Sequence, residues 1–256
     1  MQKREVSLFF SGGTDSTATS ILALNNYDKV HLLTFDRGIK YGMGQVDKTC
    51  KRAEDLIQKY GKDRFTHSVI YIGDIFREIF IDNFAHDLKI YKTHLMALVC
   101  LACRIAMHAK AILYNLKNKV PDIIDGSNQE QAFEQMPELL REYALFDGEF
   151  GINYTNPIFC FSDKDKRQEI LYEAGLSKNR KFKYALFGGT SDGIIFHPTQ
   201  PACIFSPFMG AYGRYLYHLF EDTTEEKERR IAVEYCRKKK EIARKFVNFS
   251  LSTLNL

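Results

Sequence analysis

The residues with the clearest chemical meaning stand near the start of the chain, in the stretch SLFFSGGTDSTATSILAL. An apolar run stops at two glycines, passes an acidic and a hydroxyl residue, and resumes with helix-like spacing. Glycines at such a turn let the backbone approach a phosphate, and a helix N-terminus offers N–H groups to an anion. Serine hydroxyls would add hydrogen bonds, and the aspartate would hold a magnesium ion that bridges phosphates. The residues predicted to do this are Ser11, Gly12, Gly13, Asp15 and Ser16.

This loop lacks the lysine of a Walker A motif and the third glycine of a dinucleotide fingerprint. It resembles the SGGxDS signature of the PP-loop ATP pyrophosphatases, which split ATP into AMP and pyrophosphate while activating an oxygen of the substrate. The resemblance implies ATP and Mg²⁺ as cofactors. The alternative is a glycine turn without chemical meaning, which would leave the order of strand, loop, acid, hydroxyl and helix unexplained.

Two later segments resemble the 7-cyano-7-deazaguanine synthase group of this superfamily. The first is YDKVHLLTFDRGIKYG, with the pattern V-x-x-x-T-F-D-x-G, and the second is IIDGSN. In the superfamily these segments contact the adenosine and close over the nucleotide. The resemblance therefore implies nucleotide contacts from Phe35, Asp36, Gly126 and Ser127.

The stretch NPIFCFSDKDKRQEIL resembles the proline, lysine and acid segment of the same group. Its register leaves two candidates for a phosphate-facing lysine, Lys164 and Lys166. We assign Lys166 to catalysis beside Asp15 and Ser16, and Lys164 to nucleotide binding. These matches together cover roughly the first 175 residues.

The cysteines depart from the synthase pattern, because the chain lacks that group's compact four-cysteine zinc site. Cys100 and Cys103 instead form a CxxC pair on one face of an expected helix, and Cys203 follows 100 residues later. This layout resembles the iron-sulfur-dependent tRNA thiolation enzymes of the superfamily, in which three cysteines hold a [4Fe-4S] cluster with one open iron. The run of basic residues common after CxxC in those enzymes is reduced here to Arg104 and Lys110.

Two other interpretations of the cysteines stay open. Free cysteine is among the most buried residue types, so Cys100 and Cys103 would then be small residues of an apolar helix and Cys203 would be unrelated. A zinc site that adds a histidine to the CxxC pair is the other interpretation. Its candidate histidines are His94, His108 and His197.

Short apolar segments predict strands at 6–10, 29–35, 65–72 and 121–126. Longer segments predict helices at 14–26, 45–60, 93–117 and 130–143. Their alternation predicts an α/β fold with a parallel sheet and helices on both faces. The rhythm breaks after about residue 177. We therefore expect a domain at 1–177 and a loop-rich, helical region at 178–256.

Composition predicts a soluble protein of the cytoplasm. The 256 residues are 45% hydrophobic, six cysteines are too few for a secreted disulfide scaffold, and no apolar segment approaches a membrane span or a signal peptide. The net charge of +4 is concentrated at 223–247, with nine Lys or Arg against five Glu. The densest point, RKKK at 237–240, would hold RNA, but Ile231, Tyr235, Ile242 and Phe246 at helical spacing favour a solvated amphipathic helix.

These observations predict an ATP-dependent, AMP-forming sulfur transferase that adenylates a nucleobase carbonyl, in tRNA or in a free metabolite. It would need a sulfur donor and no membrane, and a homodimer is compatible with the sequence. An amidating ligase of the 7-cyano-7-deazaguanine type, using ammonia in place of sulfide, is the first alternative. A nucleotide-binding regulatory module without catalysis is the second.

Overall fold

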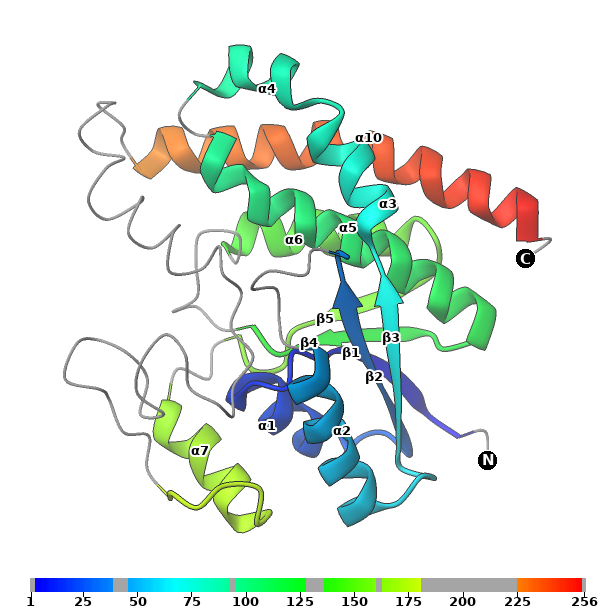
Figure 1. Cartoon of the computed structure of the whole chain (residues 1–256), viewed down its shortest axis with the longest axis vertical. Helices are drawn as coiled ribbons and strands as arrows, with labels where there is room; N and C mark the ends of the chain where they lie inside the picture. The colour runs from blue at the N-terminus through cyan, green and yellow to red at the C-terminus, as the bar shows by residue number, and fades with distance from the viewer. Residues whose placement is uncertain are drawn as a thin grey trace. The chain divides into compact units, whose positions relative to one another are not determined.

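The computed structural model describes residues 3–38, 46–92, 95–127, 136–159, 163–180 and 225–254 (Figure 1). The chain forms two compact units, each built from three separate stretches. The first comprises Met1–Ile70, Asp122–Glu130 and Thr155–Ile204, and the second comprises Tyr71–Pro121, Gln131–Tyr154 and Phe205–Leu256. The boundary expected near residue 178 stays a prediction, because residues 181–224, which follow it, lie outside the described residues.

A five-stranded sheet has the order β3-β2-β1-β4-β5. Its central strand β1 (Glu5–Phe9) pairs in parallel with β2 (Lys29–Asp36) and with β4 (Asp122–Asp125). In this register Phe9 lies opposite both Leu33 and Asp125, so the carboxyl ends of the three strands meet at one edge. The outer strands are β3 (Phe65–Tyr71) and β5 (Asn153–Thr155). The expected α/β class with a parallel sheet is confirmed.

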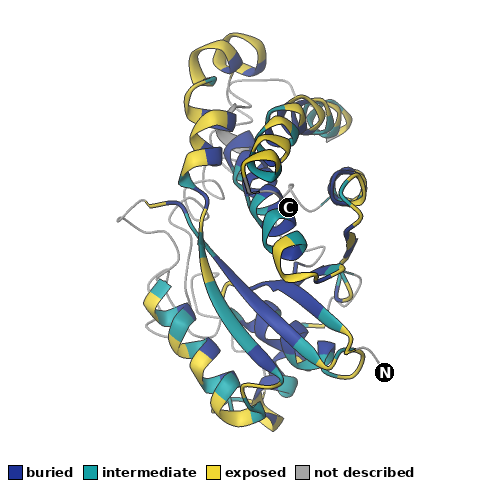
Figure 2. Cartoon of the chain, turned by 90° about the vertical axis from the view of Figure 1, so that its right-hand side faces the viewer, coloured by how far each residue is buried: buried dark blue, intermediate teal, exposed yellow. Residues whose placement is uncertain are grey.

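The central strand is buried from Val6 to its carboxyl end. All residues from Val6 to Phe10 have less than 5% of their surface exposed, although their side chains alternate between the two faces. Both faces of β1 are therefore covered, as is usual for parallel sheets. Figure 2 shows the central strands in the colour of buried residues, whereas β3 carries exposed positions.

Three helices of the first unit position the loop after β1. The first, α1 (Thr14–Ala23), packs on β1 and β2 and against α7 (Lys164–Glu173), and its buried residues are all Thr, Ser or Ala. Small side chains let a helix approach its neighbours closely. The third, α2 (Val46–Tyr60), turns Thr49, Ala53 and Leu56 inward at spacings of four and three residues.

The second unit is helical. Its elements are α3 (Gly73–Phe76), the π-helical segment η1 (Arg77–Ile81), α4 (Phe84–Tyr91), α5 (Leu95–Asn118), α6 (Pro137–Gly148) and α10 (Glu225–Leu254). Helix α5 packs against α6 and α10, and the expected helical end of the chain is confirmed as α10. The helix expected at 130–143 begins, within the described residues, at Pro137 and continues to Gly148, because proline with its fixed φ favours the first helical position.

Helix α5 corrects the expectation that no segment is long and apolar enough to span a membrane. The stretch Leu98–Asn118 reaches a mean hydropathy of 1.2, which satisfies that criterion by length and composition. However, 67% of this window is buried inside the protein. Packing against α6 and α10 accounts for its apolar character, as in the core helix of a globular unit.

Candidate active site

The loop between β1 and α1 lies at the carboxyl edge of the sheet and has the geometry predicted for a phosphate-binding turn. Gly12 has φ +73°, a left-handed conformation that side chains other than glycine's rarely adopt. A Cβ at this position would also lie 3.1 Å from the Cα of Thr49. The loop therefore requires glycine here on two grounds, backbone conformation and the closeness of α2.

The N-terminus of α1 has no side-chain cap of its own. Gly13 is the N-cap residue and offers no side chain to the N–H groups of the first turn. The first helical bond runs from the Thr17 N–H to the Gly13 carbonyl oxygen, 3.0 Å away. The N–H groups ahead of Thr17 therefore form a backbone surface suited to an anion.

The two predicted loop serines lie together beside these N–H groups. The Oγ atoms of Ser11 and Ser16 are 3.1 Å apart, and Ser11 is exposed whereas Ser16 is buried. Ser16 Oγ also donates to the Gly13 carbonyl oxygen at 3.3 Å. Two hydroxyls thus flank the glycine turn, as the sequence predicts.

Asp15 forms an ion pair that the sequence did not indicate. Arg167 Nε lies 2.8 Å from Asp15 Oδ1, and the Arg167 side chain is 1% exposed while that of Asp15 is 25% exposed. A guanidinium that is fully buried needs a partner, since an unpaired buried charge is very costly. Arg167 therefore fixes the aspartate of the loop and brings a permanent positive charge next to the proposed phosphate site.

Arg167 reaches the loop because of how α7 begins. Asp163 is the N-cap and accepts hydrogen bonds from the N–H groups of Asp165 and Lys166 at 3.0 and 3.1 Å. Arg167 is then one turn into the helix and faces α1, against which α7 packs. Lys164 is half-buried and Lys166 is exposed, and the roles assigned to both stay predictions. The N-cap pattern SDKDKR marks where α7 begins, but it does not distinguish Arg167 from the two neighbouring lysines.

The loop after β4 contacts the start of α1 at Gly126, and the nucleotide contacts expected from Gly126 and Ser127 stay predictions. A Cβ on Gly126 would lie 2.8 Å from the Cα of Ser16 and 3.0 Å from its nitrogen. Ser127 is buried, and its Oγ donates to Asp125, whose two carboxylate oxygens are both 2.9 Å away. The Ser127 hydroxyl therefore orders its own loop. Asp125, a buried carboxylate at the edge of the sheet, was not identified from the sequence.

Phe35 and Asp36 end β2 at the same edge of the sheet. The Phe35 ring packs edge-on against Phe9 of β1, with centroids 5.0 Å apart. Asp36 Oδ1 accepts a hydrogen bond from the Gly38 N–H at 2.8 Å, which turns the chain after the strand. Both residues are half-buried, so part of each faces the solvent side of the edge. The structure thus places nine of the predicted residues at three neighbouring strand ends: Ser11, Gly12, Gly13, Asp15, Ser16, Phe35, Asp36, Gly126 and Ser127.

A glycine-rich turn from the central parallel strand to an uncapped helix, with a second glycine loop against that helix, defines the PP-loop class of nucleotide-binding α/β proteins. Residues 5–143, more than half of the chain, match the family model described as "Queuosine biosynthesis protein QueC". The chain therefore belongs to the QueC family, a family of ATP-using PP-loop enzymes.

Two solved structures are similar to this chain. One is the "crystal structure of a 4-thiouridine synthetase - RNA complex with bound ATP", with TM-score 0.51 and 16% identity over 94% of this chain and 53% of that chain. The present chain thus spans about half the length of that synthetase, and the likeness shows a shared fold. The other is a "predicted subunit of tRNA methyltransferase from Methanocaldococcus jannaschii", with TM-score 0.39 and 20% identity over 78% of this chain and 96% of that chain.

The loop residues fit ATP and Mg²⁺ by their own chemistry. The left-handed Gly12, the side-chain-free Gly13 and the N-terminal turn of α1 suit phosphate oxygens. Mg²⁺ in nucleotide sites is usually held by one or two carboxylates together with substrate phosphates, and Asp15 is a partly exposed carboxylate at this loop. Arg167, already paired with Asp15, would share that carboxylate with the ion.

The CxxC pair lies in the second unit, on α5. Cys100, Cys103, Met107 and Lys110 are half-buried while the intervening residues are buried, so the two thiols share the outer side of the helix. This arrangement fits two ligands of one metal centre. Cys203, the third predicted ligand, lies outside the described residues. Within the part of the chain that the structure describes, no group of three or more His, Cys, Asp or Glu side chains is placed to hold a metal ion.

The zinc alternative loses its one described histidine. His108 is fully buried, and its Nδ1 lies 2.8 Å from Asp147 Oδ2 on α6. Burial lowers the pKa of His108 and raises that of Asp147, so both groups are driven toward their neutral forms. His108 therefore joins α5 to α6 on the side of the helix away from the cysteines. His94 and His197 lie outside the described residues.

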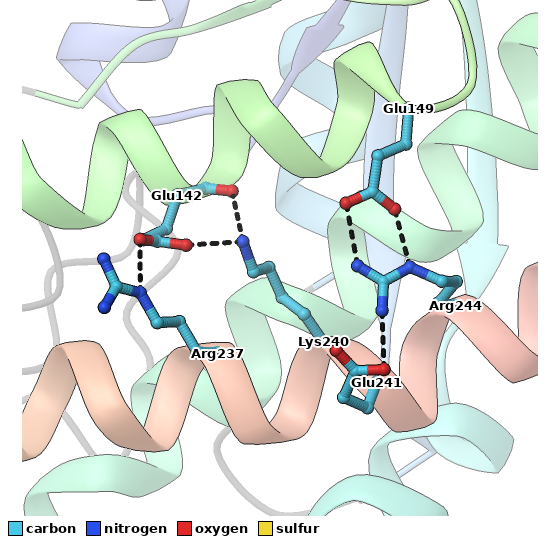
Figure 3. Close-up of polar contacts among 6 residues, drawn as sticks. All are labelled: Glu142, Glu149, Arg237, Lys240, Glu241 and Arg244. Carbon is cyan, nitrogen blue, oxygen red and sulfur yellow. Dashed lines mark hydrogen bonds and ion pairs between the residues drawn. The ribbon is translucent and has the colours of Figure 1, made fainter.

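Three of the four residues of the RKKK run form ion pairs, which favours the amphipathic-helix interpretation of this run over an RNA-binding patch. Arg237 and Lys240 both pair with Glu142 on α6, at 2.7 and 2.6 Å, as Figure 3 shows. Lys239 is buried in an ion pair with Asp87 of α4, at 2.5 Å. Farther along α10, Arg244 pairs with Glu149. Helix α10 is therefore an amphipathic helix in which these four cations are turned to acidic partners in the same unit.

Proposed function

We propose that this protein is an ATP-dependent, AMP-forming enzyme that adenylates a carbonyl oxygen of a nucleobase and replaces that oxygen with sulfur. The ATP-dependent step of this proposal is supported by the Gly12–Gly13 turn at the N-terminus of α1, where Gly13 supplies no side-chain cap and Arg167 holds Asp15. In this reaction the substrate oxygen attacks the α-phosphorus of ATP and pyrophosphate leaves. Sulfide then attacks the activated carbon, and AMP leaves with the oxygen.

The residues of the loop have distinct roles in the first step. The backbone N–H groups of the turn and the Ser11 hydroxyl would bind the phosphates that leave as pyrophosphate, where negative charge develops. Arg167 would neutralise part of that charge without losing its own proton. Gly126 would keep its loop close to α1, which fixes the position of the nucleotide relative to the turn.

The sulfur-transfer half rests on the cysteines. Cys100 and Cys103 present two thiols on one side of α5, and Cys203 is proposed as the third ligand of a [4Fe-4S] cluster. A cluster with three protein ligands would supply an open iron for the sulfur donor. Substrate tRNA is supported by the similarity to a 4-thiouridine synthetase whose structure contains RNA and bound ATP. A cytoplasmic location and a homodimer remain proposals.

The test of the nucleotide half uses ATP labelled at the α-phosphate, undermodified tRNA and sulfide. Asp15→Ala and Ser11→Ala should nearly abolish the formation of AMP and pyrophosphate without changing the fold. Asp47→Ala is the matched control, because Asp47 is an exposed acid in the first turn of α2 in the same unit. Formation of ADP and phosphate by the wild-type protein would contradict the proposal.

The test of the sulfur half is the iron content of protein purified without oxygen. We expect about four iron atoms per chain, lost when Cys100, Cys103 or Cys203 is changed to alanine. Cys50→Ala and Cys236→Ala are the controls and should keep the iron. Burial raises the pKa of Cys236 to about 12, and burial also raises the pKa of Cys50, so neither favours the thiolate that a metal needs.

Amidation is the second candidate function, and membership in the QueC family favours it. Ammonia would then attack the activated carbon in place of sulfide. Iron-free protein that forms AMP with ammonium and not with sulfide would establish this candidate. A regulatory module without catalysis would be indicated by ATP binding without AMP formation in the presence of either nucleophile.

A further inference from the structure

The carbonyl groups at the start of the phosphate loop are held by two threonine hydroxyls. Thr34 Oγ1, near the end of β2, lies 3.0 Å from the Phe10 carbonyl oxygen, and Thr49 Oγ1 of α2 donates to the Ser11 carbonyl oxygen at 3.0 Å. The Phe10 N–H donates to the Leu33 carbonyl oxygen at 2.8 Å. Both polar groups of the Phe10 backbone are thus bound to β2 immediately before the loop begins.

A histidine of the next strand completes this set of contacts. His67 Nε2, on β3, lies 2.8 Å from Thr34 Oγ1. A hydroxyl carries one hydrogen, and a carbonyl oxygen can only accept, so the Thr34 hydrogen goes to Phe10. His67 Nε2 must therefore carry a proton and donate it to Thr34. The His67 ring also meets the Phe10 ring edge-on, with centroids 6.2 Å apart.

We infer that His67 is a positioning residue for the ATP-binding loop, acting through Thr34 on the Phe10 carbonyl group. This inference rests on the proposed nucleotide site. A threonine hydroxyl without His67 could rotate away from Phe10, since the side chain has other staggered positions. The hydrogen bond donated by His67 holds the Thr34 side chain in the staggered position that binds the Phe10 carbonyl group, and this fixes the junction between strand and loop. Loss of His67 would loosen Ser11 and the glycine turn while leaving the sheet intact.

The neutral state of His67 agrees with this role. Burial lowers its pKa, and the charge of Glu54 opposes that shift in part. The ring is therefore neutral at pH 7, with its single proton on Nε2 as the hydrogen bonds require. The His67 side chain is half-buried on the edge strand. A neutral ring in this position needs no charged partner.

The test measures ATP binding by calorimetry for four variants. His67→Phe keeps the aromatic contact and removes the donor, and should weaken ATP binding by about five- to tenfold, as expected for one lost hydrogen bond. His67→Gln keeps an N–H donor and should restore most of the affinity. Thr34→Val should reproduce His67→Phe, and the double variant should bind no more weakly than Thr34→Val, because the two residues act in series.

His31→Phe is the matched control. His31 is a histidine of β2 that lies opposite Ser7 of β1, and its Nε2 lies 2.8 Å from Glu5, at the end of β1 away from the loop. It should leave ATP affinity within about twofold. Hydrogen exchange of the Ser11–Gly13 amides should be faster in His67→Phe than in the wild type, a readout that does not need ATP.

The outcomes separate the inference from the proposed function. If the wild type binds ATP and His67→Phe binds it equally well with unchanged amide exchange, the positioning role is refuted and the nucleotide site stands. If the wild type binds no ATP, both fail. If His67→Gln is as weak as His67→Phe, the donated hydrogen bond is not what positions the loop.

Discussion

Gly126→Ala tests whether the close approach of the β4 loop to α1 is essential. A Cβ would lie 2.8 Å from the Cα of Ser16, whereas carbon atoms in contact are about 3.5–4.0 Å apart. The first turn of α1 must therefore move by about 1 Å. Overpacking of this kind costs about 1–3 kcal/mol. A shift of about 1 Å in a binding turn can lower catalytic efficiency by on the order of a hundredfold.

The assay combines thermal unfolding with the initial rate of AMP formation at several ATP concentrations. For a chain of this size a loss of about 2 kcal/mol lowers the melting temperature by about 4–8 °C. Gly148→Ala is the matched control, because a Cβ at Gly148 meets nothing within 4 Å. The reasoning is refuted if Gly126→Ala unfolds at the wild-type temperature and keeps kcat/KM within twofold of the wild-type value.

Three further changes test other parts of the structure. Arg167→Met should destabilise the first unit by about 2–3 kcal/mol, since it removes the buried partner of Asp15, and it should abolish AMP formation. Arg167→Lys should recover more of the stability than of the activity. Equal activity of the two variants would contradict a directed role of the guanidinium. For Glu142, burial pushes the pKa up, but the hydrogen bonds and charges of Lys240 and Arg237 together push it below its ordinary value of 4.5. The stability from this contact is therefore full above pH 4.5 and is lost as pH falls through the lowered pKa. Glu142→Gln should be about 2 kcal/mol less stable at pH 7, and its free energy of unfolding should change less steeply with pH in acid than that of the wild type. Changing the exposed cations Arg230, Lys238 and Lys245 to glutamine should leave the free energy of unfolding within about 0.5 kcal/mol of wild type and should flatten the salt dependence of any tRNA affinity. Lys239→Met, in contrast, should unfold the second unit. Unchanged tRNA affinity in the triple variant would exclude this face of α10 as a tRNA-binding surface.

The identity of the loop was determined by residues close together in the sequence. The run from Val6 to Phe10, the two glycines and the small polar residues that follow specify strand, turn and helix by their local preferences. The predictions for Phe35, Asp36 and Gly126 came from the resemblance to the synthase group, and the strand order agrees with them because the ends of parallel strands meet at one edge. These predictions concern local conformation and the class of site, which short-range pattern controls.

The partners of the loop could not be predicted in the same way. Arg167 meets Asp15 across 152 positions of the sequence, and Thr49 and His67 reach the loop from α2 and β3. Nothing in the local sequence distinguishes Arg167 from Lys164 or Lys166, since all three are cations at the start of one helix. The rotation of α7 against α1 decides which of them is buried on the aspartate.

The basic run of α10 illustrates the same division. The sequence by itself predicted an amphipathic helix rich in cations at 223–247, because helical period and composition are local properties, and the structure shows this helix as α10. It did not determine whether those cations face solvent. Glu142 lies 95 residues before Arg237 and 98 before Lys240, and Asp87 lies farther still. Only the packing of α10 against α4 and α6 decided that these charges stabilise the fold, since burying a charge requires a partner that tertiary structure alone brings within reach.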